Sequence, residues 1–331
     1  MISRQLSDKI RFVSFLCTLM VVFRHSLNME AFEIDGNGHS YVSIIENGIS
    51  KLTEVAVPYF FLVSGFFFLR YSYFGKGEYL KMLCKKAHTL FLPFVFWNIV
   101  GLIPLVLMHR VAIENSLWKY SLQLLNSEWN GVLWYVRDIM IMMLLAPLYS
   151  WVFLLNRRWL YALLFLLLFF NWMPVDCSLL STEGMLFFFL GGVLQKKSSF
   201  LEKKFPKWTI FFGCVVWLIS SFAFPHCWAI HRYNTLLGLF VVWQLCDYVP
   251  TRVFLGVLGV SSYSFFIYVL HADVIKSMKV GLAHFFCGQE AVALASYFVL
   301  PLVTVSVLLI VGKLFNRYIP QVFNFVMGGR C

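Results

Sequence analysis

The stretch AVALASYFVLPLVTVSVLLIVG, residues 291–312, contains no charged side chain and consists mainly of Val, Leu, Ala and Ile. As an α-helix with a rise of about 1.5 Å per residue it would be about 33 Å long, which matches the roughly 30 Å hydrocarbon core of a bilayer. Its length and composition therefore predict a helix that crosses a membrane.

Four other uncharged segments approach this length and predict further spanning helices: residues 89–108, 159–175, 208–225 and 253–270. Five shorter or partly charged segments are weaker candidates: residues 12–29, 55–69, 131–153, 185–195 and 233–246. Of the 331 residues, 60% are hydrophobic and 13% are charged, so lipid is the expected solvent. The prediction is an all-α, polytopic bundle of about ten transmembrane helices, in which residues 1–331 form a single integral-membrane domain.

The distribution of charge predicts the orientation of the chain. Lys and Arg are concentrated in segments such as residues 70–88 and 195–207, whereas residues 30–53 carry several acidic side chains, including Glu46. Because cytoplasmic loops retain positive charge, we place both termini in the cytoplasm and the chain in the inner or plasma membrane, in contact with lipid. The net charge of +11 is accounted for by these short loops, so nucleic acid is not an expected partner.

The eight Cys show no spacing with each other or with His that is typical of a metal site, so no metal is predicted.

Two ionisable residues, Arg24 and His25, lie deep in the first predicted span. His25 is 14 residues beyond Arg11, which places it about 20 Å past the inner boundary of the membrane. An ionisable residue at that depth is costly and is a functional candidate by default, and histidine can accept a proton near neutral pH. The alternative is a neutral histidine bonded to a neighbouring helix, with Arg24 reaching outward to the interface.

A second polar group lies in the fourth predicted span, where Trp134 precedes Arg137 and Asp138 by three and four residues. Adjacent helical residues point about 100° apart, so Arg137 and Asp138 are each expected to need a partner of their own. The group is predicted to line a polar cavity for a substrate, and the alternative is an aromatic anchor at the outer interface. For His271, at the end of the ninth predicted span, an interfacial position is expected.

Lys81, Lys85 and Lys86 lead into the third predicted span from the inside. Their ammonium groups could hold phosphates, but inner loops of membrane proteins are generally basic, so charge alone assigns them no function.

Six segments, in this order, resemble the acyltransferase 3 family of membrane acyltransferases: SDKIRFVSFLCTLMVVFRHSLN (7–28), VAVPYFFLVSGFFFLR (55–70), YLKMLCKKAHTLFLPFVFWN (79–98), LWYVRDIMIMMLLAPL (133–148), LLSTEGMLFFFLGGVLQ (179–195) and SSYSFFIYVLH (261–271). The resemblance covers nearly the whole chain. It implies that His25 is the family's functional histidine at the end of the first span, and that Lys85 and Lys86 occupy the family's basic positions before the third.

Two positions depart from the family pattern. The family's arginine eleven residues before the histidine is here Ser14, but Arg11 lies about 40° from His25 around the helix and can substitute for it. The family's arginine pair is here Lys85 and Lys86, which keeps the charge but loses bidentate phosphate geometry.

The resemblance implies an O-acyltransferase that moves an acyl group, preferably acetyl, from acyl-coenzyme A on the cytoplasmic side to a hydroxyl of a surface or periplasmic glycan. His25 would be the general base, and Arg11, Lys85 and Lys86 would bind the donor phosphates. The acceptor path would be bordered by Arg24, Trp134, Arg137 and Asp138. Separate glycan-assembly proteins would supply the acceptor.

Two questions stay open in this interpretation. A carboxylate could orient the imidazole, with Asp138, Glu30 and Glu183 as unranked candidates, and a covalent acyl-histidine step fits the same residues. The rival function is a proton-coupled transporter or flippase that uses Arg24, His25, Arg137 and Asp138 as a relay without acyl-transfer chemistry, although no inverted repeat of interrupted spans supports it.

Overall fold

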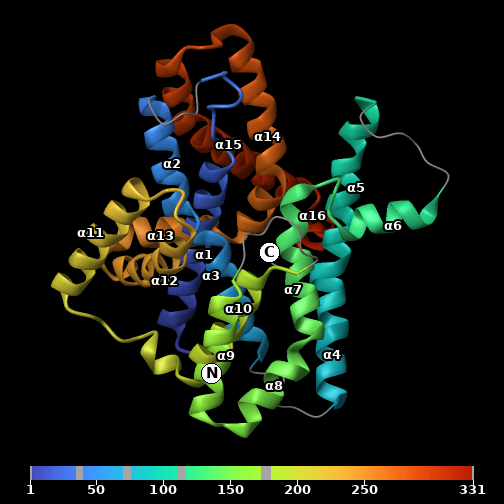
Figure 1. The fold of residues 1–331 in the computed structure, drawn as a ribbon. Coiled ribbons are helices and arrows are strands. Elements are labelled where there is room, and N and C mark those ends of the chain that lie inside the picture. Colours follow the sequence, from blue (N-terminus) through green and yellow to red (C-terminus); the bar gives the residue numbers. More distant parts are fainter. Residues whose placement is uncertain (1, 35–39, 70–75, 110–115, 173–179, 330–331) are drawn as a thin grey trace. The chain divides into compact units, whose positions relative to one another are not determined.

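The computed structural model describes residues 2–34, 40–69, 76–109, 116–172 and 180–329 (Figure 1). Within these ranges every regular element is a helix, which confirms the all-α prediction. Serine side chains cap several helix starts, as expected for a residue whose oxygen accepts from a free backbone N–H. Ser3 caps α1 (Arg4–Arg24) by accepting from Leu6 N, and Ser40 caps α2 (Tyr41–Thr53) by accepting from Val42 N.

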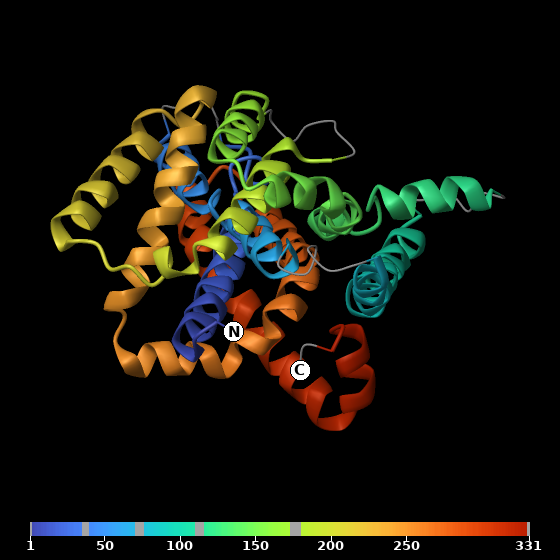
Figure 2. The same cartoon turned by 90° about the horizontal axis from the view of Figure 1, so that it is seen from below.

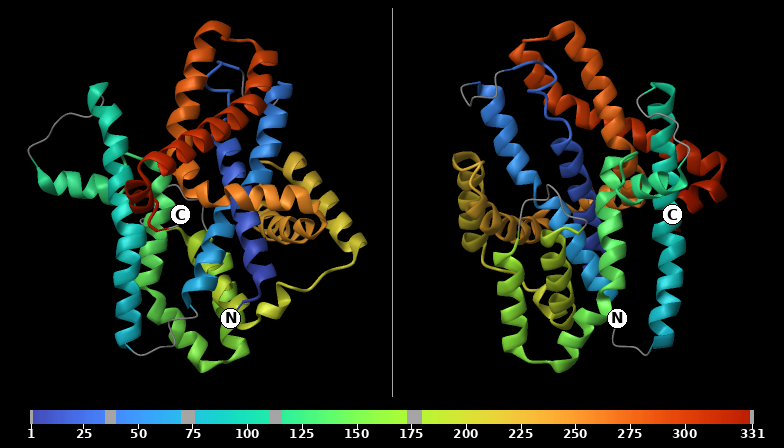
Figure 3. Two further views of the ribbon diagram at one scale, coloured as in Figure 1. Left: turned by 180° about the vertical axis from the view of Figure 1, so that it is seen from behind. Right: turned by 45° about the vertical axis from the view of Figure 1, so that its right-hand side comes forward.

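One compact unit consists of residues 1–60 and 198–313. It contains α1, α2, the start of α3 (Ala56–Phe68), α11 (Lys207–Ala223), α12 (Trp228–Leu245), α13 (Thr251–Val260), α14 (Ser264–Phe286) and most of α15 (Glu290–Tyr318). Helix α1 packs against α14, α2 and α13, and α11 packs against α12 and α2. Figure 2 shows α11 and α12 in yellow and gold as neighbours, and Figure 3 shows the turn that joins α14 to α15.

The other unit consists of residues 61–197 and 314–331. It holds the rest of α3, α4 (Lys76–Lys86), a π-helical turn η2 (Ala87–Phe91), α5 (Leu92–Leu107), α6 (Leu117–Leu125), α7 (Trp134–Leu144), α8 (Ala146–Leu155), α9 (Arg158–Phe170), α10 (Thr182–Lys196) and α16 (Pro320–Val326). Helices α3 and α10 touch through their backbones, because a Cβ on Gly65 would overlap the carbonyl of Phe188 and one on Gly191 would overlap that of Leu62. Such small residues let membrane helices approach closely.

Four helical stretches of the described chain are long and apolar enough to cross a membrane: Tyr41–Phe68, Gly77–Leu107, Thr251–Phe286 and Glu290–Tyr318. A fifth follows if α7 and α8, which are bent by 51° relative to each other, count as one span. The chain is therefore a helical protein with several membrane-span candidates. The number of ten spans, the orientation of the termini and the single domain over residues 1–331 stay predictions.

Three predicted boundaries were wrong. Helix α1 ends at Arg24, short of residue 29, and side chains of other helices bind the backbone of residues 27 and 28 outside it. The span predicted from residue 55 belongs to a helical stretch that begins at Tyr41, so residues 41–53 of the polar segment before it are helical. The helical stretch that contains the span predicted to end at residue 270 continues to Phe286, and Lys279 in this extension binds the Leu27 carbonyl.

Candidate polar site at the end of the first helix

His25 is the C-cap residue of α1, and its side chain is exposed. The helix stops here because the backbone N–H groups of His25 and Ser26 donate to Val21 O and Phe23 O, and the Ser26 hydroxyl also donates to Phe23 O at 2.8 Å. These bonds satisfy carbonyls that a further turn would have used. The result is an accessible imidazole at the end of a helix whose other side is buried.

The segment that follows His25 is fixed by side chains from other helices. The Glu46 carboxylate on α2 accepts from Asn28 N at 2.8 Å, and the Lys279 ammonium on α14 donates to Leu27 O at 2.6 Å. Glu46 is 0% exposed.

Helix α15 holds the same segment from another direction. The Asn28 side-chain amide donates to Ala293 O and Ser296 Oγ, both at 2.8 Å, and the Ser26 hydroxyl lies 3.3 Å from Tyr297 O. Helices α2, α14 and α15 thus constrain the backbone beside His25, and such constraint is what a catalytic side chain needs to keep its geometry.

A second histidine lies against His25. The ring centroids of His25 and His271 are 5.0 Å apart, with the planes inclined by 67°. His271 is 0% exposed, and its Nδ1 lies 2.7 Å from Tyr268 O. Helix α14 continues for several turns beyond His271, and the side chain is buried beside His25. The expected interfacial position of His271 stays a prediction.

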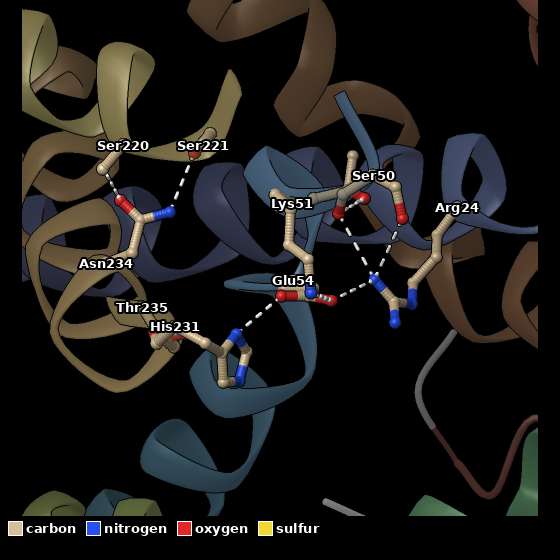
Figure 4. A network of polar contacts seen from close by, with 10 residues as sticks. Arg24, Ser50, Lys51, Glu54, Ser220, Ser221, His231, Asn234 and Thr235 are labelled. Carbon is tan, nitrogen blue, oxygen red and sulfur yellow. Dashed lines mark hydrogen bonds and ion pairs between the residues drawn. The ribbon is translucent and has the colours of Figure 1, made fainter. Parts of the chain in front are cut away.

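Arg24 takes part in a charged network rather than reaching outward. Its Nη1 donates to Glu54 Oε1 at 3.0 Å and to the backbone and side-chain oxygens of Ser50 at 3.3 Å (Figure 4). Lys51 Nζ lies 3.0 Å from the same Glu54 oxygen, and His231 Nδ1 lies 2.7 Å from Glu54 Oε2. A carboxylate only accepts, so His231 donates from Nδ1. The network ties the end of α1 to α2 and α12.

The α12 side of this network continues into α11. Asn234 donates from its side-chain amide to Ser221 Oγ at 2.8 Å and accepts from the Ser220 hydroxyl (Figure 4). Because Asn234 lies one turn beyond His231, the same face of α12 binds both α11 and Glu54.

Arg11, the predicted donor-binding residue, lies on α1, and His25 is the C-cap residue of the same helix. The predicted angle of about 40° between the two residues assumed that they share one helix. Its Nη2 donates to Leu258 O and Ser261 Oγ, each at 3.2 Å, and its Nη1 lies 3.7 Å from Asp8. The side chain is 51% exposed, so an anion could still reach the guanidinium.

In the second unit, Arg137 and Asp138 bind each other. Arg137 donates from Nε and Nη2 to Asp138 Oδ1 at 2.9 and 2.8 Å, and Ser181 N donates to Asp138 Oδ2 at 2.8 Å. The expectation that each needed a separate partner was wrong, because the long arginine side chain bends across the 100° between them. Trp134 begins α7, with its ring centroid 6.2 Å from that of Phe61.

Lys85 and Lys86 form the last turn of α4 in this second unit. Lys85 is exposed and Lys86 is half-buried. The helix continues beyond them through η2 into α5, so the two lysines lie within a longer helical stretch.

The predicted residues therefore fall into two groups. His25, Arg24 and Arg11 belong to one unit, whereas Lys85, Lys86, Trp134, Arg137 and Asp138 belong to the other. Among the described residues, no group of three His, Cys, Asp or Glu side chains is arranged to hold a metal ion.

Sequence reasoning did not single out Glu54 and His231, and it gave Glu46 and His271 no role. Their one common signal is a polar side chain close to an apolar run, which is too general to connect them to His25.

The described chain is thus a helical protein with membrane-span candidates and with an exposed histidine at the end of its first helix. The acyltransferase 3 family, described as an acyltransferase domain, matches residues 10–312. The chain belongs to this family, which confirms the resemblance and implies membrane acyltransferase activity. No curated protein and no solved structure matches it.

Proposed function

We propose that this chain is a membrane O-acyltransferase that transfers an acyl group, preferably acetyl, from acyl-coenzyme A to a hydroxyl of a surface or periplasmic glycan, with His25 as the general base. The observation that carries the proposal is the exposed His25 imidazole at the end of α1, beside a segment bound by three other helices. Family membership supports acyl transfer over the transporter alternative.

In the proposed reaction, a ring nitrogen of His25 takes the proton of the acceptor hydroxyl while the hydroxyl oxygen attacks the thioester carbonyl. The new ester C–O bond forms, the C–S bond breaks, and the His25 proton passes to the departing sulfur. The products are the acylated glycan and free coenzyme A. Direct transfer needs no covalent enzyme intermediate, although the same imidazole could carry the acyl group.

The donor and acceptor residues remain those of the sequence prediction. Arg11 on α1, and Lys85 and Lys86 on α4, would bind the phosphates of acyl-coenzyme A as cations. Arg24, Trp134, Arg137 and Asp138 would border the acceptor path. With the donor on the cytoplasmic side of the inner or plasma membrane, the acceptor would come from the outer side, delivered by glycan-assembly proteins.

The test is release of free coenzyme A by the purified protein in lipid nanodiscs, supplied with acetyl-coenzyme A and a panel of glycans. We expect release by the wild type and at least a ~100-fold lower rate for His25→Ala, the usual scale of general-base catalysis. His284→Ala removes an exposed histidine from the same helix as His271 and is the matched control, expected to keep full activity. Equal rates for wild type and His25→Ala would remove His25 from the mechanism. Silence across several acyl donors, together with glycan movement across the bilayer, would favour the transporter.

A further inference from the structure

The contact between His25 and His271 places two imidazoles of unequal exposure side by side. His25 is exposed, whereas His271 is 0% exposed and lies on α14, which packs against α1. With a centroid distance of 5.0 Å and an inclination of 67°, the edge of one ring lies over the other. A change in the buried His271 ring therefore acts directly on the exposed His25 ring, because the two rings are in contact.

The backbone fixes the proton arrangement of the buried ring. His271 Nδ1 lies 2.7 Å from Tyr268 O, and a carbonyl oxygen can only accept, so Nδ1 carries the hydrogen. In the neutral ring, Nε2 then has a lone pair and no hydrogen. Hydrogen bonding of one ring nitrogen to a backbone carbonyl is a common way in which proteins set the tautomer of a functional histidine.

The remaining nitrogen of this ring has no bond to satisfy it. His271 Nε2 is buried and makes no hydrogen bond within the described chain. Buried polar atoms without a partner are uncommon in native proteins, and each needs a physical explanation. A neutral Nε2 requires a donor, and the adjacent His25 ring, whose centroid lies 5.0 Å away, carries an N–H.

We infer that His271 is a positioning residue for His25: its Nε2 accepts a hydrogen bond from the His25 ring and fixes the His25 tautomer. The opposite His25 nitrogen is then left without a hydrogen and faces the exposed side, where it can take the proton of an acceptor hydroxyl. This inference rests on the proposed function for its catalytic part, but the hydrogen bond between the two rings can be measured without turnover.

The pairing also gives the orienting group a different chemistry from the one expected. From the sequence, a carboxylate was expected to orient the His25 ring. In the described chain the His271 imidazole contacts it. A neutral partner fixes the tautomer without adding a negative charge. The net charge at this end of α1 is then set by other groups. Glu46 is buried there, and Arg24 forms an ion pair with Glu54.

Two variants of similar size separate the hydrogen bond from simple packing. His271→Gln keeps a side chain that can accept a hydrogen bond, whereas His271→Leu fills similar space without an acceptor. We expect His271→Leu to lower kcat about 100-fold and to change KM for acetyl-coenzyme A less than about twofold. We expect kcat of His271→Gln to be at least about tenfold higher than that of His271→Leu. Wild-type kcat in His271→Leu, or equal losses in both variants, would overturn the inference.

A spectroscopic measurement covers the cases in which a variant fails to fold or the protein proves to have a different activity. In wild-type protein with ¹⁵N-labelled histidine in nanodiscs, we expect His271 to show a protonated Nδ1 and an unprotonated, hydrogen-bonded Nε2. His25→Gln should shift the Nε2 resonance. An Nε2 that carries the proton, or a resonance that His25→Gln leaves unchanged, would refute the pairing. A coupled pair in a protein that releases no coenzyme A would refute the proposed function alone.

Discussion

The Glu54 carboxylate binds three side chains, two of them cations and the third a histidine. Arg24 and Lys51 both lie 3.0 Å from Oε1, and His231 lies 2.7 Å from Oε2. The side chain is only 12% exposed, so water compensates little if the charge is removed. Because Arg24 directly precedes His25, this carboxylate controls both the stability of the helix junction and the position of the candidate base.

We predict that Glu54→Gln destabilises the folded protein. Removing one member of a buried ion pair costs about 3–5 kcal/mol, but Arg24 is 41% exposed, so solvent screening should reduce the loss to about 2 kcal/mol. Thermal unfolding in nanodiscs measures the effect. Glu202→Gln, which changes an exposed carboxylate that accepts from Ser3, is the control and should unfold like the wild type. If the two variants were equally stable, the Glu54 network would have no structural role.

Asp138 is a comparable case in the second unit, since both of its oxygens are used and its side chain is 1% exposed. Asp138→Asn loses the negative charge and leaves Arg137 unbalanced, which should cost about 3 kcal/mol or more. The double variant Arg137→Met/Asp138→Asn should recover about 1–3 kcal/mol of the summed single losses, as expected for residues that act as a pair.

The Asp138 comparison needs denaturation of wild type, both single variants and the double variant, with the exposed Glu78→Gln as control. Strictly additive losses would mean that the contact contributes no coupling. A stable double variant that had lost acyl transfer would support the predicted substrate role of this pair.

At the scale of helices, the crossing of α3 and α10 depends on small residues. A Cβ at Gly191 would overlap the Leu62 carbonyl and lie 2.6 Å from Phe66 N, and these backbone atoms cannot rotate away as a side chain could. The two helices would have to separate, which would weaken their packing along the crossing.

We predict that Gly191→Ala lowers the thermal unfolding midpoint, with a loss of about 1–3 kcal/mol from overpacking. Gly256→Ala on α13 is the matched control, because a Cβ there meets nothing within 4 Å and alanine is the better helix former. The control should unfold at the wild-type temperature or above it. Equal behaviour of the two variants would show that α3 and α10 do not approach as closely as described.

For the molecule as a whole, the charge distribution predicts the orientation in the membrane, and two native cysteines can report it. Cys84 lies in α4 among the basic residues predicted inside, and Cys287 lies in the turn between α14 and α15 that is predicted outside. Both side chains are exposed. In intact cells, a membrane-impermeant maleimide should label a variant that keeps only Cys287 and should spare one that keeps only Cys84.

Permeabilised cells provide the control for labelling, since both single-cysteine variants should react there. The reverse pattern in intact cells would invert the topology and place the proposed donor-binding residues outside. Labelling of both variants in intact cells would contradict the predicted location of Cys84 and Cys287 on opposite sides of the membrane.

The helical class, the membrane-span candidates and the family could all be predicted from the sequence. These properties depend on the length and hydrophobicity of local segments, which add along the chain and need no knowledge of the contacts. His25 was selected as a candidate in the same way, because an ionisable residue in an apolar segment stands out against its neighbours, and its catalytic role stays a prediction.

The contacts between side chains could not be predicted in this way and became visible with the packed helices. The contact of His25 with His271, and that of Glu54 with His231, join residues far apart in the sequence and depend on which helix faces turn toward each other. Even the adjacent Arg137 and Asp138 were misjudged, because the helical angle fixes the directions of the Cβ atoms but not the path of a long side chain. The physical reason is that burial forces polar groups to find partners, and which partners are within reach is a property of the packed helices.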